Sequence, residues 1–128
     1  MKNMKEVVNG IFERTRKEIP EFISISLVNI SDGMPLAFSS VVPEAQGKGD
    51  ISSAYGTNAI ISCRKALKAM SQKNELIECI YFKPEVLSIF RVIGPKYWMG
   101  LGFAPNANLG IIKVLMGKFE EELMKVLY

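Results

Sequence analysis

The sequence contains no histidine, and only two of its 128 residues are cysteine. Histidine is the usual general base near neutral pH and a frequent metal ligand, so its absence argues against acid–base catalysis and against a zinc site. Cys63 and Cys79 occupy apolar positions in their segments, which predicts buried free thiols in a reducing compartment. We therefore expect no catalytic residues, no metal site and no cofactor.

Long apolar runs and strongly basic runs are also missing. No stretch approaches the ~20 apolar residues of a membrane span, and the first residues carry a charge every few positions, unlike a signal peptide. The net charge is only +3 at pH 7, and no arginine-rich or aromatic-interleaved basic segment is present. We therefore expect a cytoplasmic protein that neither inserts into a membrane nor binds nucleic acid.

What remains is an ordinary globular composition. The 128 residues, 48% hydrophobic and 23% charged, predict a single domain over residues 1–128 with one core. Apolar residues at three- and four-residue spacing indicate helices, and short apolar or β-branched runs between turn residues indicate strands. The predicted helices span residues 4–19, 51–72 and 111–128, and the predicted strands span 22–30, 36–42, 76–82, 86–93 and 97–103.

The order of these segments is α-β-β-α-β-β-β-α, which predicts an α+β fold. Short connections make the last three strands an antiparallel meander, and a single five-stranded antiparallel sheet with helices on both faces buries every apolar stripe. Residues 43–50 are predicted to form a loop, with Asp50 as the N-cap of the middle helix. Gly100 and Gly102 share one face of the last strand, which predicts a helix packed closely above them, with a nucleotide pocket as the weaker alternative.

Residues 31–37, with the sequence SDGMPLA, lie between the first two predicted strands. Asp-Gly provides the positive φ that a tight hairpin needs, so Gly33 is expected in the left-handed region. Pro35 has no backbone donor, which places the second strand at a sheet edge or the proline at the strand's first residue.

The middle helix is predicted to be apolar on two faces. The arc expected to face the sheet comprises Tyr55, Ala59, Ile60, Cys63, Ala66, Leu67 and Met70. The outward residues expected to contact a protein partner are Thr57, Ile61, Arg64, Lys65 and Lys68. An isoleucine among basic residues, with the small apolar Ala54 and Ala69 on the same outer half, predicts a second packing surface. Its basic rim would attract an acidic or mixed-charge protein.

Residues 76–82, with the sequence LIECIYF, are apolar on both faces of the predicted strand. The first strand of a meander is expected at a sheet edge, and an uncovered apolar edge pairs readily with another strand. The same strand of a second copy would cover it by two-fold symmetry, which predicts a homodimer. The predicted dimer interface comprises Leu76, Glu78, Ile80, Phe82, Ala54 and Ala69.

The turn D-G-x-P-L-A, placed after an amphipathic helix and a strand, resembles the roadblock/dynein-light-chain family of small adaptors, and the element order resembles the roadblock/longin architecture. The resemblance covers residues 7–127. It implies a non-catalytic dimer in which the edge strands pair into one continuous sheet and the middle helices lie side by side. It also implies a small Ras-like GTPase as partner, as in many stand-alone prokaryotic members. No motif for GTPase activation is present to be carried over.

Two other functions stay open at this point. The chain could be a structural scaffold that binds proteins independently of nucleotide state, with a second copy or another roadblock chain as its other subunit. It could also be a profilin- or PAS-like sensor of a small ligand, although the large side chains of Phe90, Trp98 and Phe103 argue against spare volume in the core.

Overall fold

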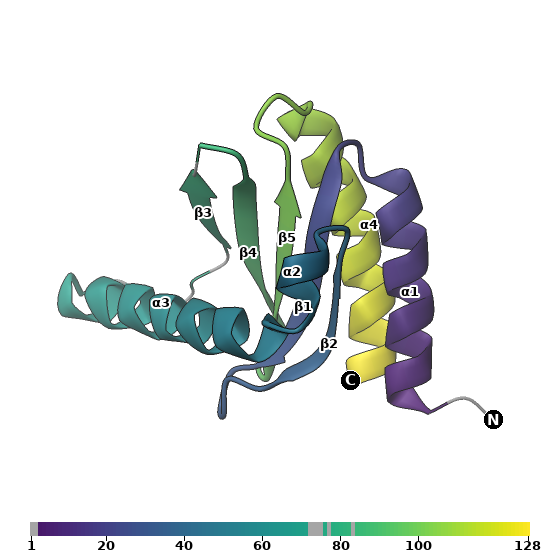
Figure 1. Ribbon diagram of the computed structural model, residues 1–128. Coiled ribbons are helices and arrows are strands. Elements are labelled where there is room, and N and C mark those ends of the chain that lie inside the picture. Colours follow the sequence, from purple (N-terminus) through teal and green to yellow (C-terminus); the bar gives the residue numbers. More distant parts are fainter. Residues whose placement is uncertain (1–2, 72–75, 77, 83) are drawn as a thin grey trace.

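The computed structural model describes residues 3–71, 76, 78–82 and 84–128 and has the predicted α+β class, with one additional short helix (Figure 1). Its elements are α1 (Met4–Glu18), β1 (Phe22–Asn29), β2 (Pro35–Ser40), α2 (Pro43–Gln46), α3 (Gly49–Ala69), β3 (Glu78–Phe82), β4 (Leu87–Ile93), β5 (Tyr97–Phe103) and α4 (Leu109–Leu127).

The strands form a five-stranded sheet in the order β2-β1-β5-β4-β3. Every neighbouring pair is antiparallel, and the first and last strands of the chain, β1 and β5, are paired at the centre. This confirms the predicted sheet and the predicted meander. It also confirms that β3 lies at one edge, while β2 lies at the other.

The hairpin between β1 and β2 forms as predicted. Gly33 has a φ of 70°, and the Asp32 side chain accepts a hydrogen bond from the Met34 amide at 2.8 Å. The side chain of Asn29 accepts a hydrogen bond from the amide of Ser31, two residues later, at 2.9 Å. Pro35 is the first residue of β2, an edge strand, so its missing donor costs no ladder hydrogen bond.

The two faces of the sheet are covered unequally. Figure 1 shows α1 and α4 side by side along one face and α3 crossing the opposite face. The larger core lies under α1 and α4 and includes Ile25, Leu27, Ile89, Leu101 and Phe119, all almost completely buried. The smaller core lies under α3 and contains Val28, Ile60 and Trp98. The α3 helix therefore covers only part of its face.

The segment between β2 and α3 differs from the prediction. Residues 43–50 are not a loop: Pro43 occupies the first turn of the short helix α2, where a proline needs no amide donor. Lys48 is the N-cap of α3 and makes no side-chain capping bond, so Asp50 lies inside the first turn instead of capping it. A Cβ at position 49 would lie 2.8 Å from the Phe38 ring, too close for a side chain, so glycine fits at the first residue of α3.

Candidate functional site

The inner face of α3 combines small and polar residues with Ile60, so the predicted arc is only partly right. Thr57 is only 4% exposed, and its Oγ1 accepts a hydrogen bond from Trp98 Nε1 at 2.9 Å while donating to the Ser53 carbonyl at 2.8 Å. Gly56 lies directly over the Trp98 ring, where a Cβ would approach within 2.6 Å. The buried Trp98 indole thus needs Thr57 as a hydrogen-bond acceptor and Gly56 as a residue without a side chain beside its ring. These two contacts determine which side of α3 faces the sheet.

Ile60 is buried against the sheet as predicted, but the assignments of four other residues of α3 are wrong. Thr57 was expected to face a partner, but it is buried against the sheet. Tyr55 was expected to face the sheet, but it is 73% exposed, and Met70 and Ala66 are exposed with it. The prediction followed hydrophobicity, whereas the side of α3 that faces the sheet carries Ser53, Gly56 and Thr57, because the Trp98 ring fills the space between this side and the sheet.

The predicted basic surface is only partly at the surface of the molecule. Lys65 and Lys68 are exposed, whereas Ile61 is half-buried. Arg64 is also half-buried, and its Nε is out of contact with solvent and has no hydrogen-bond partner among the described residues. Lys65 and Lys68 can therefore meet a partner directly, and their role in binding one stays a prediction.

The face of α3 that points away from the sheet carries no charge along most of its length. Ala54 and Ala69, both predicted to lie in a dimer contact, are exposed on this face. The other exposed uncharged residues that accompany them are Ile51, Tyr55, Asn58, Ser62 and Ala66. We call these seven residues the outer stripe of α3. Lys65, three residues after Ser62 and seven after Asn58, also lies on this face. A helix face with so little charge over this length, and with two large apolar side chains, is typical of a packing surface.

The outer edge of β3 is unpaired in the described part of the chain. The strand begins at Glu78, two residues later than predicted, and its sequence neighbour Ile77 lies outside the described residues. Ile80 is 40% exposed, which suits an interface residue. Leu76 instead packs partly against the small core of Ile60 and Trp98. The side chain of Phe82 also lies outside the described part, so its place in an interface stays a prediction.

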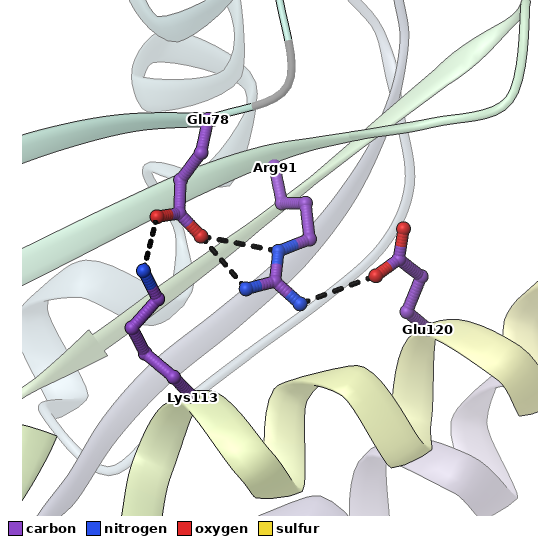
Figure 2. Close-up of polar contacts among 4 residues, drawn as sticks. All are labelled: Glu78, Arg91, Lys113 and Glu120. Carbon is purple, nitrogen blue, oxygen red and sulfur yellow. Dashed lines mark hydrogen bonds and ion pairs between the residues drawn. The ribbon is translucent and has the colours of Figure 1, made fainter. Parts of the chain in front are cut away.

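Glu78 is held by an ion network on the face of α4, shown in Figure 2. Its carboxylate accepts from Arg91 Nη2 at 2.8 Å and from Lys113 Nζ at 2.9 Å, and Arg91 Nη1 donates to Glu120 at 3.1 Å. Burial alone would raise the pKa of Glu78, but Lys113 and Arg91 outweigh it and hold the pKa below its usual value. The network thus ties the edge strand β3 to β4 and α4.

Sequence reasoning missed this network, because its four members are far apart along the chain and each one looks like an ordinary surface charge. It placed Glu78 in the dimer interface. In the structure the Glu78 carboxylate is paired within its own chain, so Glu78 would support an interface by positioning β3.

A groove of about 420 Å³ lies on the part of the sheet that α3 leaves open, with α2 as its side wall. Its floor consists of small residues, and Gly100 and Gly102 make room for serine hydroxyls: a Cβ would lie 2.8 Å from Ser26 Oγ and 2.7 Å from Ser24 Oγ. The prediction that these glycines admit a helix is therefore wrong. The aromatic and apolar residues that line the groove are Phe38, Val42, Val86, Phe90 and Trp98.

No group of three or more His, Cys, Asp or Glu side chains among the described residues could hold a metal ion. Within the same part of the chain, no helix has the length and apolar character needed to cross a membrane.

Comparisons with solved structures identify the fold. MglB from Myxococcus xanthus superposes with a TM-score of 0.87 at 13% identity, covering 99% of this chain and 92% of that one. A gliding protein MglB from Thermus thermophilus gives 0.84 at 16% identity, with coverages of 98% and 92%. A Roadblock/LC7 domain from Streptomyces avermitilis gives 0.80 at 13% identity, covering 98% of each chain. No family model and no curated protein matches the sequence.

Proposed function

We propose that this chain, which has the roadblock fold of MglB and the Roadblock/LC7 domains, is a non-catalytic homodimeric adaptor that binds and regulates a small Ras-like GTPase. The observation that carries the proposal is the outer stripe of α3, a largely uncharged helix face that includes the position of the exposed Lys65 and has Lys68 beside it. A monomer has no use for such a face, whereas an adaptor needs one surface for its second copy and another for its partner.

The proposed dimer joins two copies through the unpaired edge of β3. An open edge with an exposed isoleucine is a template for pairing with another strand, and the ion network of Glu78 and Arg91 keeps that edge in place. Pairing across a two-fold axis would continue the sheet into the second copy. The outer stripes of the two α3 helices would then lie on the same face of the continuous sheet.

Light scattering on the purified protein tests the dimer. Ile80→Asp places a charge on the pairing edge of each copy, and we expect the dimer dissociation constant to rise by at least about tenfold. Met34→Asp is the matched control, because Met34 is 54% exposed at the β1–β2 turn beside the opposite sheet edge. A wild-type protein that stays monomeric at micromolar concentration contradicts the proposed dimer.

The basic border of the outer stripe would contact the GTPase. Exposed charges mainly set the rate and specificity of association, so the contribution of Lys65 and Lys68 should be sensitive to salt. The double variant Lys65→Glu with Lys68→Glu should slow association with the cognate GTPase by about tenfold and flatten the salt dependence. The double variant Lys5→Glu with Lys17→Glu changes net charge equally on α1 and should bind like the wild type.

The nucleotide state of the GTPase separates regulation from scaffolding. A regulator binds GDP- and GTP-loaded protein with different affinities, while a passive scaffold binds both equally. Equal affinity for the two forms would reject regulation and leave the scaffold function. Unchanged kinetics for the Lys65→Glu and Lys68→Glu variant would place the partner contact elsewhere on the molecule.

The groove over the serine and glycine floor favours one other candidate, a small-ligand sensor. Its volume of about 420 Å³ lies within the range of about 300–1,000 Å³ typical of ligand pockets. Phe90 and Trp98 form one wall of this groove as well as packing in the smaller core, and Phe103 lies in the larger core, so these large side chains leave the groove open. Ser88→Leu would narrow the groove, and loss of binding of an anilinonaphthalene sulfonate probe in this variant would support the sensor.

A further inference from the structure

The only two cysteines of the sequence lie in contact with each other. Cys63 belongs to α3 and Cys79 to β3, and the Cys79 thiol donates a hydrogen bond to Cys63 Sγ with 3.6 Å between the sulfur atoms. Both residues are half-buried and carry free thiols. Sequence reasoning treated them as two separate buried thiols, because their helix and strand positions gave no sign of this contact.

The geometry around the two thiols allows a covalent bond. A disulfide requires about 2.05 Å between the sulfurs, so the two atoms must approach by roughly 1.5 Å. Glu78 and Ile80 alternate with Cys79 along β3, and Glu78 reaches the face of α4, so Cys79 faces α3. The ion pairs of Glu78 hold β3 in place, so the approach is made by rotation of the two cysteine side chains.

We propose that Cys63 and Cys79 are an oxidation site, at which a peroxide converts the two thiols into a reversible disulfide within one chain. The bond would join the helix α3 to the edge strand β3 directly. It would add a covalent link between β3 and the helix whose Ile60 lies in the small core around Trp98.

The reaction proceeds in two steps that balance. Cys63 sulfur attacks one peroxide oxygen, the O–O bond breaks, and the products are a sulfenic acid at Cys63 and one water. Cys79 sulfur then attacks the Cys63 sulfur, its proton passes to the departing hydroxyl, and a second water leaves as the S–S bond forms. The Cys79 thiol donates its hydrogen bond to Cys63 Sγ, which assigns the first step to Cys63. Burial and the neighbouring Cys63 also raise the pKa of Cys79 to about 11.

The disulfide would stabilise the fold by restricting the unfolded chain. A closed loop of about 15 residues is expected to raise the melting temperature by about 10 °C in a domain of this size. If the proposed function is right, the same bond connects the helix that carries Lys65 and Lys68 to the proposed dimer edge. That consequence rests on the proposed function, whereas formation of the bond does not.

The test treats the full-length folded protein with a small excess of hydrogen peroxide and then alkylates the remaining thiols. We expect the intact mass to fall by two hydrogen atoms, both cysteines to resist alkylation, and a proteolytic digest to contain the Cys63 and Cys79 peptides joined together. The melting temperature should rise by about 10 °C and return to its starting value after treatment with dithiothreitol.

Two variants serve as controls. Cys63→Ala and Cys79→Ala each remove one partner, so peroxide should neither join the peptides nor raise the melting temperature in either variant. Wild-type protein that gains oxygen at the cysteines without a bond between them would overturn the proposal. A disulfide that joins two copies would overturn it equally. Neither result would bear on GTPase binding, which is measured separately on reduced protein.

Discussion

The contact between Gly56 and Trp98 provides a quantitative test of how α3 is seated. Glycine inside a helix normally costs about 1 kcal/mol relative to alanine, so a glycine-to-alanine change in open space should stabilise the protein. In α3 the new Cβ would lie 2.6 Å from Trp98 Cη2, 2.7 Å from Cζ2 and 3.3 Å from Phe90 Cε2. The helix must therefore lift or the buried indole must move, and either shift strains the Thr57 hydrogen bond.

Overpacking of this kind costs about 1–3 kcal/mol, and the rigid, 1% exposed indole puts the cost near the upper end. After the gain in helix propensity is subtracted, we expect Gly56→Ala to lower the free energy of unfolding by about 2 kcal/mol. Urea denaturation followed by fluorescence of Trp98, the single tryptophan of the sequence, measures this change directly.

Gly10→Ala in α1 is the matched control, since nothing lies within 4 Å of the position that the added methyl group would take. This variant should raise the free energy of unfolding by up to about 1 kcal/mol. A Gly56→Ala protein as stable as the wild type would show that α3 does not rest on Trp98 as described. The orientation of the outer stripe would then be wrong too.

Three further changes probe other parts of the molecule. Gly33→Val forces a β-branched residue to a φ of 70° and should cost about 1–3 kcal/mol of unfolding free energy, measured by urea denaturation. Thr57→Val leaves the buried Trp98 N–H without its acceptor and should cost about 1–3 kcal/mol by the same method, a result that an exposed Thr57 would not give. Folding lowers the pKa of Glu78. The ionised Glu78 carboxylate therefore stabilises the fold at pH values above its pKa in the unfolded chain, and this stabilisation is lost as the pH falls through its pKa in the folded protein. The Glu78→Gln variant should therefore be less stable than the wild type at pH 7 and nearly as stable as the wild type at pH 3. An equal difference in melting temperature between the two proteins at both pH values would refute the role of the network.

Features with a local cause could be predicted from the sequence. The last strand is predicted at residues 97–103, and the structure has β5 there, because alternating apolar residues between two turns leave little choice of boundary. Gly33 and Pro35 fix the hairpin and its edge position through their own backbone limits. The edge position of β3 follows from the order and length of the connections.

Features that depend on a partner far away in the sequence could not be predicted. The hydrophobicity of α3 placed Ile60 correctly but missed Gly56 and Thr57, because their place on the inner face depends on Trp98, far away along the chain. The pairing of Glu78 with Lys113, and the contact of Cys63 with Cys79, leave no periodic signal in either segment. The outer stripe of α3 could be recognised only once the structure showed which side of the helix faces the sheet.

The central pairing of β1 with β5 has a consequence for how the chain is made. This ladder matches Phe22 with Phe103 and Asn29 with Tyr97, so the middle of the sheet is built from strands far apart in the sequence. Closing so long a loop is slow, since its entropy is lost before the contacts form. During synthesis the early hairpin must therefore wait, with only α1 available to cover its apolar face, until β5 has left the ribosome, and the open strand edge of β1 favours aggregation in this interval.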